Sequence, residues 1–389
     1  MFFFSGDCLS CIREQGMIET FPQTVDHQLK LTKLWEMSPD FNFVKHCSDL
    51  YFISQDANLF VASRRGIIKK INIYNGHVIW SINLSVSKKM QLCNFSVLLS
   101  GGLIISDDIL YIGSELSRIY AICAKTGKVL WEVRVAGGVL SSPVISGDLL
   151  LINTCVGILQ ALNKYDGSIR WSISFSLPLF SFRSKANPII VSDVAIIAND
   201  NGIINAILVN EGKILWEQKI FDIYKSKEFF FLNAIQLTPI VIGNTIYAQA
   251  YNSRLVALDV DSGQIIWRSK IDGIKNIITI GYILYIIDQD DQVIAVDAHN
   301  GKILWKQDFF LYKHLTAPVV YNDNYLFVGD RKGFVYLINM NNGNIAFQKK
   351  ISSFRKSSRL VLVADNILIV LLKNCRISVF LYMVTDNFD

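Results

Sequence analysis

Two cysteines near the start of the chain, Cys8 and Cys11, have the C-x-x-C spacing that metal-binding and redox sites use. No second cysteine pair completes a zinc site, and no strand–helix pattern follows the first pair, as a redox motif would require. A lipoprotein leader is the better interpretation, with Cys11 as the residue that is lipidated. The leader is poor, because residues 1–4 are its only apolar start and no basic region precedes them.

The other residues that could support catalysis are scattered along the chain. The five histidines are His27, His46, His77, His299 and His314. The cysteines of the body of the chain, which we expect to be small core residues, are Cys47, Cys93, Cys123, Cys155 and Cys375. The odd total of seven cysteines argues against a disulfide framework. With no nucleophile–base pair, no phosphate-binding glycine loop and no spacing of metal ligands, we predict no catalytic residue, no cofactor and no metal.

Charge and hydropathy exclude two further classes of protein. The net charge is only +5, and no basic run alternates with aromatics, so a nucleic-acid-binding surface is not predicted. Hydrophobic residues make up 51% of the chain and the mean hydropathy is +0.33. No apolar run reaches the roughly 18–20 residues of a membrane-spanning helix. We therefore interpret the most apolar segments, 277–287 and 360–372, as strands that are buried on both faces.

A repeated turn and strand explains this composition. The string HNGKILW at 299–305 recurs almost unchanged as NEGKILW at 210–216 and KTGKVLW at 125–131. Its glycine recurs as Gly76, Gly127, Gly167, Gly212, Gly263, Gly301 and Gly343. An aromatic follows four residues after each glycine, namely Trp80, Trp131, Trp171, Trp216, Trp267, Trp305 and Phe347. Since six of the seven tryptophans belong to this series, the repeat determines the fold prediction.

Each repeat predicts four short strands. The segment before the glycine alternates and is rich in β-branched residues, as in RLVALDV at 254–260. The glycine supplies a positive φ in a tight hairpin turn, and two more strands lie upstream, as in 141–157 and 237–253. Successive glycines are 38 to 51 residues apart, near the roughly 40–45 residues of a propeller blade. We expect each repeat aromatic to pack between neighbouring blades.

The chain ends suggest how the ring closes. Seven repeats reach residue 350, and 359–384 supply three more strands without glycine or tryptophan. Trp35 precedes Trp80 by one period of 45 residues, so the strand around Trp35 is expected to complete the last blade. The prediction is an all-β, eight-bladed β-propeller of four-stranded antiparallel blades. Its domains are a leader and linker at 1–30, the propeller at 31–384 and a tail at 385–389.

The turn pattern A-x-D-x-x-x-G-x-x-x-W resembles the repeat of pyrroloquinoline-quinone-type propellers. Within that superfamily the chain from about 31 to 384 resembles the BamB family of outer-membrane protein assembly factors. The similarity extends outside the repeat and is strongest in the stretches 98–137, 159–171, 250–268 and 328–339.

The resemblance implies a non-enzymatic scaffold. Members of the family are lipoproteins on the periplasmic face of the outer membrane of Gram-negative bacteria. They bind the periplasmic domains of BamA and assist the folding and insertion of β-barrel proteins, which are possible clients. By the same resemblance, a lipid anchor at Cys11 would give peripheral membrane association.

The family's partner-binding loop aligns on residues 178–183 of this chain. The residues that the resemblance assigns to the partner contact are Leu179, Phe180, Phe182 and Arg183. A second, acidic family loop aligns on 233–236, where Ala234 and Gln236 stand and no carboxylate is present. Because of this departure, either the partner has changed as well or the first loop alone makes the contact.

Two other functions remain open from the residues. A quinone-dependent dehydrogenase would carry adjacent cysteines and an acidic calcium site, and this chain has no adjacent cysteines. A propeller interaction module with a different envelope partner would differ only in what the 178–183 loop contacts. Propellers host many unrelated roles, so the fold itself does not decide between them.

Overall fold

The structure, a computed structural model, describes the greater part of the chain. The described ranges are 28–37, 50–85, 97–178, 185–221, 234–235, 237–251, 253–321, 323–351, 357–363, 366–372 and 376–385. Every regular element within these ranges is a β-strand. Among the described residues, no helix has the length and hydropathy needed to cross a membrane.

The strands form eight four-stranded antiparallel sheets, which we number as blades 1 to 8. Blade 1 contains β2 (Leu50–Gln55), β3 (Asn58–Ser63), β4 (Ile67–Asn72) and β5 (Val78–Asn83), and blade 2 contains β6 (Leu99–Ser106), β7 (Ile109–Ser114), β8 (Arg118–Cys123) and β9 (Val129–Arg134). Blade 3 contains β10 (Val144–Ser146), β11 (Leu149–Asn153), β12 (Ile158–Asn163) and β13 (Ile169–Ser174), and blade 4 contains β14 (Ile189–Val191), β15 (Val194–Ala198), β16 (Ile203–Leu208) and β17 (Lys213–Lys219). Blade 5 contains β18 (Ile240–Ile242), β19 (Thr245–Ala248), β20 (Arg254–Asp259) and β21 (Ile265–Asp272), and blade 6 contains β22 (Ile274–Ile280), β23 (Ile283–Asp288), β24 (Val293–Asp297) and β25 (Ile303–Gln307). Blade 7 contains β26 (Val319–Tyr321), β27 (Tyr325–Gly329), β28 (Phe334–Asn339) and β29 (Ile345–Lys350), and blade 8 contains β30 (Ser357–Val363), β31 (Ile367–Leu372), β32 (Ile377–Thr385) and β1 (Gln28–Met37).

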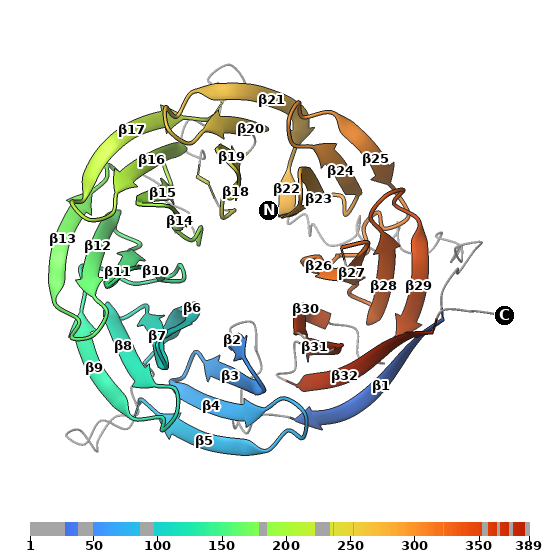
Figure 1. The fold of residues 1–389 in the computed structure, drawn as a ribbon, viewed down its shortest axis with the longest axis horizontal. Coiled ribbons are helices and arrows are strands. Elements are labelled where there is room, and N and C mark those ends of the chain that lie inside the picture. Colours follow the sequence, from blue (N-terminus) through green and yellow to red (C-terminus); the bar gives the residue numbers. More distant parts are fainter. Residues whose placement is uncertain are drawn as a thin grey trace, which may run out of the picture.

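The blades surround a central axis, and the first strand of the chain closes the ring (Figure 1). Strand β1 pairs antiparallel with β32, from Gln28 opposite Thr385 to Met37 opposite Ile377. In Figure 1 the blue β1 and the red β32 lie side by side. The predicted eight-bladed, all-β propeller with closure by the strand around Trp35 is thus confirmed. Because β32 pairs with β1 on one side and β31 on the other, it lies inside the sheet and has no free edge.

The meander within each blade defines two faces of the ring. The turns between the first and second strands, and between the third and fourth, lie at one end of the blade. We call this end the glycine-turn face. The turns between the second and third strands share the other end with the blade-to-blade connections. We call that end the connection face.

The hydrophobic core lies between blades rather than inside a single layer. Each cluster of buried residues joins two neighbouring blades, as where Phe60 and Ile68 of blade 1 meet Leu110 and Ile112 of blade 2. Tryptophan occupies the outer strand of most blades, opposite a small residue on the third strand. The alanines paired with a tryptophan are Ala121, Ala161, Ala206, Ala257 and Ala295. An alanine leaves room beside the indole, which explains the alanine of the sequence repeat.

Each tryptophan reaches the glycine turn of the next blade. Its indole nitrogen donates a hydrogen bond to the carbonyl three residues before that blade's glycine, at 2.6–3.1 Å. These bonds run from Trp35 to Ile73, Trp80 to Ala124, Trp131 to Lys164, Trp171 to Val209, Trp216 to Val260, Trp267 to Ala298 and Trp305 to Met340. A Cβ atom on Gly343 would lie 2.6 Å from Trp305, so the close contact, together with the positive φ of 74°, requires glycine.

The glycine turn is longer than the two-residue hairpin that the sequence predicts. The amide of Gly301 donates to the carbonyl of Asp297, and the amide of Asp297 donates to the carbonyl of Lys302, so four residues form the loop. The side chain of Asp297 also accepts the amide of His299 at 2.9 Å. Equivalent side chains at Asn72, Asn163, Asp259 and Asn339 accept turn amides in the same way. The recurrent Asp or Asn of the repeat therefore caps the turn.

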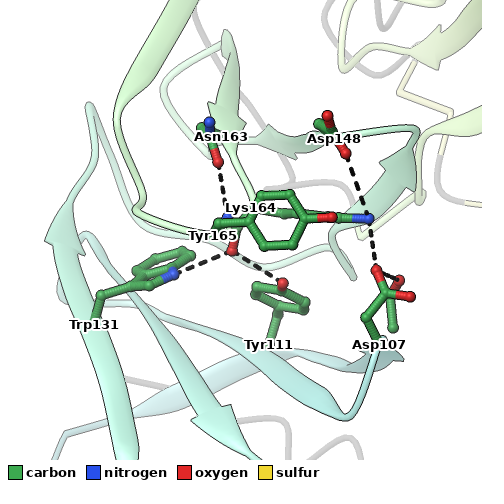
Figure 2. Close-up of polar contacts among 8 residues, drawn as sticks. Asp107, Tyr111, Trp131, Asp148, Asn163, Lys164 and Tyr165 are labelled. Carbon is green, nitrogen blue, oxygen red and sulfur yellow. Dashed lines mark hydrogen bonds and ion pairs between the residues drawn. The ribbon is translucent and has the colours of Figure 1, made fainter.

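Three blade interfaces add a tyrosine to the tryptophan. At the interface of blades 2 and 3, the carbonyl of Lys164 accepts Trp131 at 3.1 Å and the hydroxyl of Tyr111 at 3.0 Å (Figure 2). The Lys164 ammonium lies 2.7 Å from Asp107 and 3.9 Å from Asp148. The hydrogen bond from Lys164 lowers the pKa of Asp107 and raises that of Lys164. The other two such pairs are Tyr247 with Trp267 and Tyr285 with Trp305.

The interface between blades 7 and 8 differs from the others. Phe347, which has no N–H donor, occupies the tryptophan position and packs against Leu31, Phe380 and Tyr382. Blade 8 is completed by β1, from the opposite end of the chain, so no hairpin turn joins its two outer strands. Phenylalanine therefore stands at the interface where the next blade offers no glycine turn to accept a hydrogen bond.

Candidate partner-binding site

The partner-binding and lipidation residues expected from the sequence lie outside the described part of the chain. These are Leu179, Phe180, Phe182 and Arg183 of the partner loop, Gln236 of the second loop and the lipidation candidate Cys11. The residues next to both loops are described, and they lie on the connection face of blades 3 to 5. The described surroundings therefore define how the candidate site is held.

The chain that leads into the first loop is fixed at three points. The amide of Phe175 donates to the carbonyl of Gly157 at 2.7 Å. The side chain of Leu177 packs on Gly157, where an added Cβ would lie 2.8 Å from Leu177. The side-chain amide of Asn201 donates to the carbonyl of Ser176 at 3.0 Å. Leu177 is nevertheless 41% exposed, so an apolar side chain is presented to solvent immediately before the predicted partner residues.

The chain that leaves the first loop is fixed at Asn187. The amide of Ser142 donates to the side-chain oxygen of Asn187 at 2.7 Å, and the amide of Asn187 donates to the hydroxyl of Thr238 at 3.0 Å. Each of these residues precedes a proline, and the inner strand of a blade begins at the residue after that proline. Asn187 thus links the entry points of blades 3, 4 and 5 on the connection face.

The described residues of the second loop are buried, and backbone hydrogen bonds fix them to neighbouring segments. Ala234 is 1% exposed and Ile235 is 0% exposed. The amide of Ile235 donates to the carbonyl of Asn199 at 3.3 Å, and the amide of Tyr251 donates to the carbonyl of Ala234 at 2.9 Å. Neither side chain is placed to contact a partner.

One turn of blade 4 therefore touches the neighbours of both loops. It lies between β15 and β16, at residues 199–202, and binds Ser176 through Asn201 and Ile235 through Asn199. Asn199 is itself held by a buried hydrogen bond of 2.7 Å to Asn205. The repeat motif does not predict this turn. Its signal was the string NDNG at 199–202, a run of turn-forming residues outside the repeat motif.

A small hollow on the same face does not offer a substrate pocket. It is lined by Asn153, Thr154, Cys155, Gly157, Leu177, Ala198, Asn199 and Asp200, and its volume is about 20 Å³. This volume holds about one water molecule. Among the described residues, no group of three or more histidine, cysteine or acidic side chains is arranged to hold a metal ion.

Comparison with known proteins identifies the family. A family model described as outer membrane protein assembly factor BamB matches residues 64–307, more than half of the chain. The chain belongs to the BamB family. The outer membrane protein assembly factor BamB of Yersinia pestis is 37% identical over 89% of this chain and 88% of its own length. The protein of the same name from Escherichia coli K12 is 35% identical over 87% of this chain and 86% of its own length.

A solved structure supports the fold. The crystal structure of BamB from Moraxella catarrhalis superposes with a TM-score of 0.74, covering 90% of this chain and all of that one. Its sequence identity is 24%, so the likeness speaks for the propeller alone. The BamB relatives match well beyond the glycine–tryptophan repeat, which confirms the resemblance seen in the sequence.

Proposed function

We propose that this chain is a non-enzymatic scaffold subunit of the BAM complex on the periplasmic face of the outer membrane. In this role it binds the periplasmic domains of BamA and assists the folding and insertion of β-barrel proteins. The observation that carries the proposal is the match to named BamB proteins over nearly the whole ring. Membrane association through a lipid on Cys11 belongs to the same proposal.

The contact with BamA is proposed to lie on the connection face of blades 3 to 5. Leu179, Phe180, Phe182 and Arg183 would make it, with Leu177 at its edge. Aromatic and arginine side chains are the usual energetic centres of protein interfaces, and the arginine fork pairs with a carboxylate or with backbone carbonyls. The contacts of Asn187 and Asn201 support this position, because they fix the chain on both sides of the loop.

The test is binding of the full chain to the purified periplasmic domains of BamA from the same organism. We expect Phe182→Ala/Arg183→Glu to abolish capture, because the variant removes one anchor and reverses one charge. The matched control is Tyr282→Ala/Lys302→Glu, which makes the same kinds of change at exposed positions on the glycine-turn face. Circular dichroism verifies that both variants are folded.

The outcome also separates the alternatives. Capture by the wild type and the control, but not by the loop variant, supports the BamA scaffold and its site. A folded wild type that does not bind BamA contradicts the proposed partner and favours an interaction module with another envelope protein. An absorbance change on addition of a quinone cofactor would instead favour the dehydrogenase alternative.

A further inference from the structure

The turns between the second and third strands lie on the connection face and are built alike in several blades. In blades 1, 2, 3, 4 and 7, the carbonyl of the last turn residue accepts an amide from the chain that leaves the blade. These carbonyls belong to Gly66, Ser117, Gly157, Gly202 and Gly333. The residue before the carbonyl is polar or charged in three of these blades, as Arg65, Asn201 and Lys332. In the neighbouring blades 2 and 3 it is aliphatic, as Leu116 and Val156.

These two aliphatic residues remain in contact with water. Leu116 is 51% exposed and Val156 is 43% exposed, and Leu177, at 41%, lies on the same face. Among the described residues, the other large apolar side chains of this face with similar exposure are Tyr251 and Tyr312, in blade 5 and after blade 6. A single exposed leucine is ordinary on a protein surface. Exposed apolar side chains that adjoin one another are typical of interaction sites.

The turns that carry Leu116 and Val156 adjoin one another across Gly138. An added Cβ on Gly138 would lie 2.7 Å from the carbonyl oxygen of Glu115 and 3.3 Å from the sulfur of Cys155. Glu115 and Cys155 immediately precede Leu116 and Val156 in the chain. The two turns therefore contact the same glycine, one from each blade.

Val156 also connects this pair of turns to Leu177. An added Cβ on Gly137 would lie 2.5 Å from the side chain of Val156, so Val156 covers the connection from blade 2 to blade 3. The side chain of Leu177 packs on Gly157, the residue after Val156. Leu116, Val156 and Leu177 thus follow one another across blades 2 and 3, and we call them the apolar arc.

Backbone hydrogen bonds hold the arc in place. The amide of Val139 donates to the carbonyl of Ser114 at 3.0 Å, and the amide of Cys155 donates to the carbonyl of Gly138 at 2.8 Å. The connection from blade 2 to blade 3 is therefore bonded to both turns of the arc. Because these turns are already fixed, a partner that covers them would lose little affinity to the ordering of the chain.

One end of the arc adjoins the proposed BamA loop. Leu177 immediately precedes residues 178–183, so a partner that contacts this loop also comes close to the arc. At the other end, Glu115 pairs with Arg64 at 2.9 Å, so an ion pair borders the arc there. The fully covered part of a protein interface is depleted in charged residues, as the arc is.

We propose that the apolar arc extends the BamA contact from the 178–183 loop onto blades 2 and 3, where it binds an apolar segment of the same periplasmic domain. The inference rests on the proposed function. Its basis is the adjacency of Leu177 to the loop, together with the aliphatic residues at turn positions that are polar or charged in blades 1, 4 and 7.

The test measures the affinity of the full chain for the periplasmic domains of BamA by biolayer interferometry. Leu116→Asn/Val156→Asn gives both turns the residue that blade 4 has at this position, Asn201. We expect this variant to bind about tenfold more weakly or worse, because it removes two apolar contacts. Circular dichroism verifies that it is folded.

The matched control is Val129→Asn/Leu304→Asn, which changes the same residue types at 45% and 52% exposed positions on outer strands. Its affinity should equal that of the wild type. Wild-type affinity in the arc variant would overturn the arc and leave the 178–183 contact intact. Equal loss in the arc and control variants would also overturn it. A folded wild type that does not bind BamA would overturn the proposed function itself, and the arc with it.

Photo-crosslinking tests the contact without relying on a loss of binding. With benzoylphenylalanine in place of Leu116, illumination of the chain mixed with the BamA domains and an unfolded β-barrel protein should give an adduct with BamA. The same group in place of Leu304 should give no such adduct. An adduct of position 116 with the unfolded β-barrel protein alone would overturn the proposal in favour of a client segment on the arc.

Discussion

At the scale of single residues, the carbonyl oxygen of Lys164 shows how two blades are joined. It accepts the indole of Trp131 and the hydroxyl of Tyr111, whose rings lie 5.9 Å apart. Both donors come from blade 2 and the acceptor from blade 3. Because an unpaired buried polar group costs free energy, the two donors favour one relative position of the blades over others with equal apolar contact.

The tryptophan of each interface should therefore contribute strongly to stability. We expect Trp267→Ala to lower the free energy of unfolding by about 3–5 kcal/mol, through the cavity and the lost hydrogen bond to Ala298. Trp267→Phe should cost less, because it keeps most of the ring. Urea unfolding measures both variants. The control is Ile266→Ala at an exposed position, which should change the free energy of unfolding by no more than about 0.5 kcal/mol. A loss below about 1 kcal/mol for Trp267→Ala would contradict this role.

The buried tyrosines should make stability fall at high pH. Burial raises the pKa of Tyr111 to about 12, whereas an unfolded tyrosine has a pKa of about 10. The folded pKa is the higher one, so this contribution is complete below pH of about 10 and is lost as pH rises towards 12. Tyr111→Phe should flatten the decline in unfolding free energy over that window, measured by urea titrations at several pH values. The same flattening in Tyr282→Phe, which removes an exposed hydroxyl, would contradict the assignment.

At the scale of elements, the turn at 199–202 matters because it contacts segments from two different connections. It binds Ser176 before the proposed partner loop and Ile235 within the connection from blade 4 to blade 5. A loop that is fixed at its ends loses less conformational entropy when a partner binds. The turn would thus act on binding through the position of the chain and not through contact with the partner.

We expect Asn201→Ala to weaken BamA binding without unfolding the chain. The loss of one hydrogen bond, roughly 0.5–1.5 kcal/mol, corresponds to a decrease in affinity of up to about tenfold. Biolayer interferometry measures the affinity, and Asn210→Ala at an exposed position on the glycine-turn face is the control. If Asn201→Ala binds as the wild type does while Phe182→Ala/Arg183→Glu does not, the loop is the site but the turn does not position it.

The sequence predicts the strands well because the repeat is periodic. The glycine and the aromatic four residues later recur in seven blades, and an alanine lies opposite the aromatic in five of them, so each blade supports the interpretation of the others. The geometry of the turn was not predicted in the same way. The dipeptide Asn300-Gly301 suggests a two-residue hairpin, but the side chain of Asp297 accepts the amide of His299 and favours the longer loop.

The site residues are harder to predict than the strands, for a physical reason. Ser142, Asn187 and Thr238 are separated by 45 and 51 residues along the chain, and the topology alone brings them together. The role of Asn201 likewise depends on the contact with Ser176 in a neighbouring connection. Residues that do not repeat from blade to blade carry no periodic signal, and functional residues of a propeller are of this kind.

At the scale of the whole molecule, closure of the ring depends on ten residues, Gln28–Met37. They supply the outer strand of blade 8, and Trp35 packs on Gly76 of blade 1. The carbonyl of Leu31 also accepts the ammonium of Lys349 from blade 7 at 3.1 Å. One short strand therefore contacts three consecutive blades.

Removal of this strand should open the ring. A chain that lacks residues 1–37 leaves β32 with an exposed edge, and we expect it to aggregate. A chain that lacks only residues 1–27 should remain folded and monomeric, as measured by size-exclusion chromatography and circular dichroism. A synthetic peptide of residues 28–37 should restore the soluble ring when it is added during refolding. Equal stability of the two truncated chains would contradict closure by β1.

Closure by β1 also means that the chain could begin and end at another place while the ring of blades stays the same. Gln28 and Thr385 face each other across two paired strands, so their Cα atoms are within roughly 4.5–5.5 Å. A linker of two to four residues could join them as a hairpin, and new termini could be opened in any of the seven glycine turns. In such circular permutants a hairpin would join the two outer strands of blade 8. The two ends of the chain, which now meet in blade 8, would meet in another blade. The ring would then have no fixed first blade, and its assembly order could be chosen.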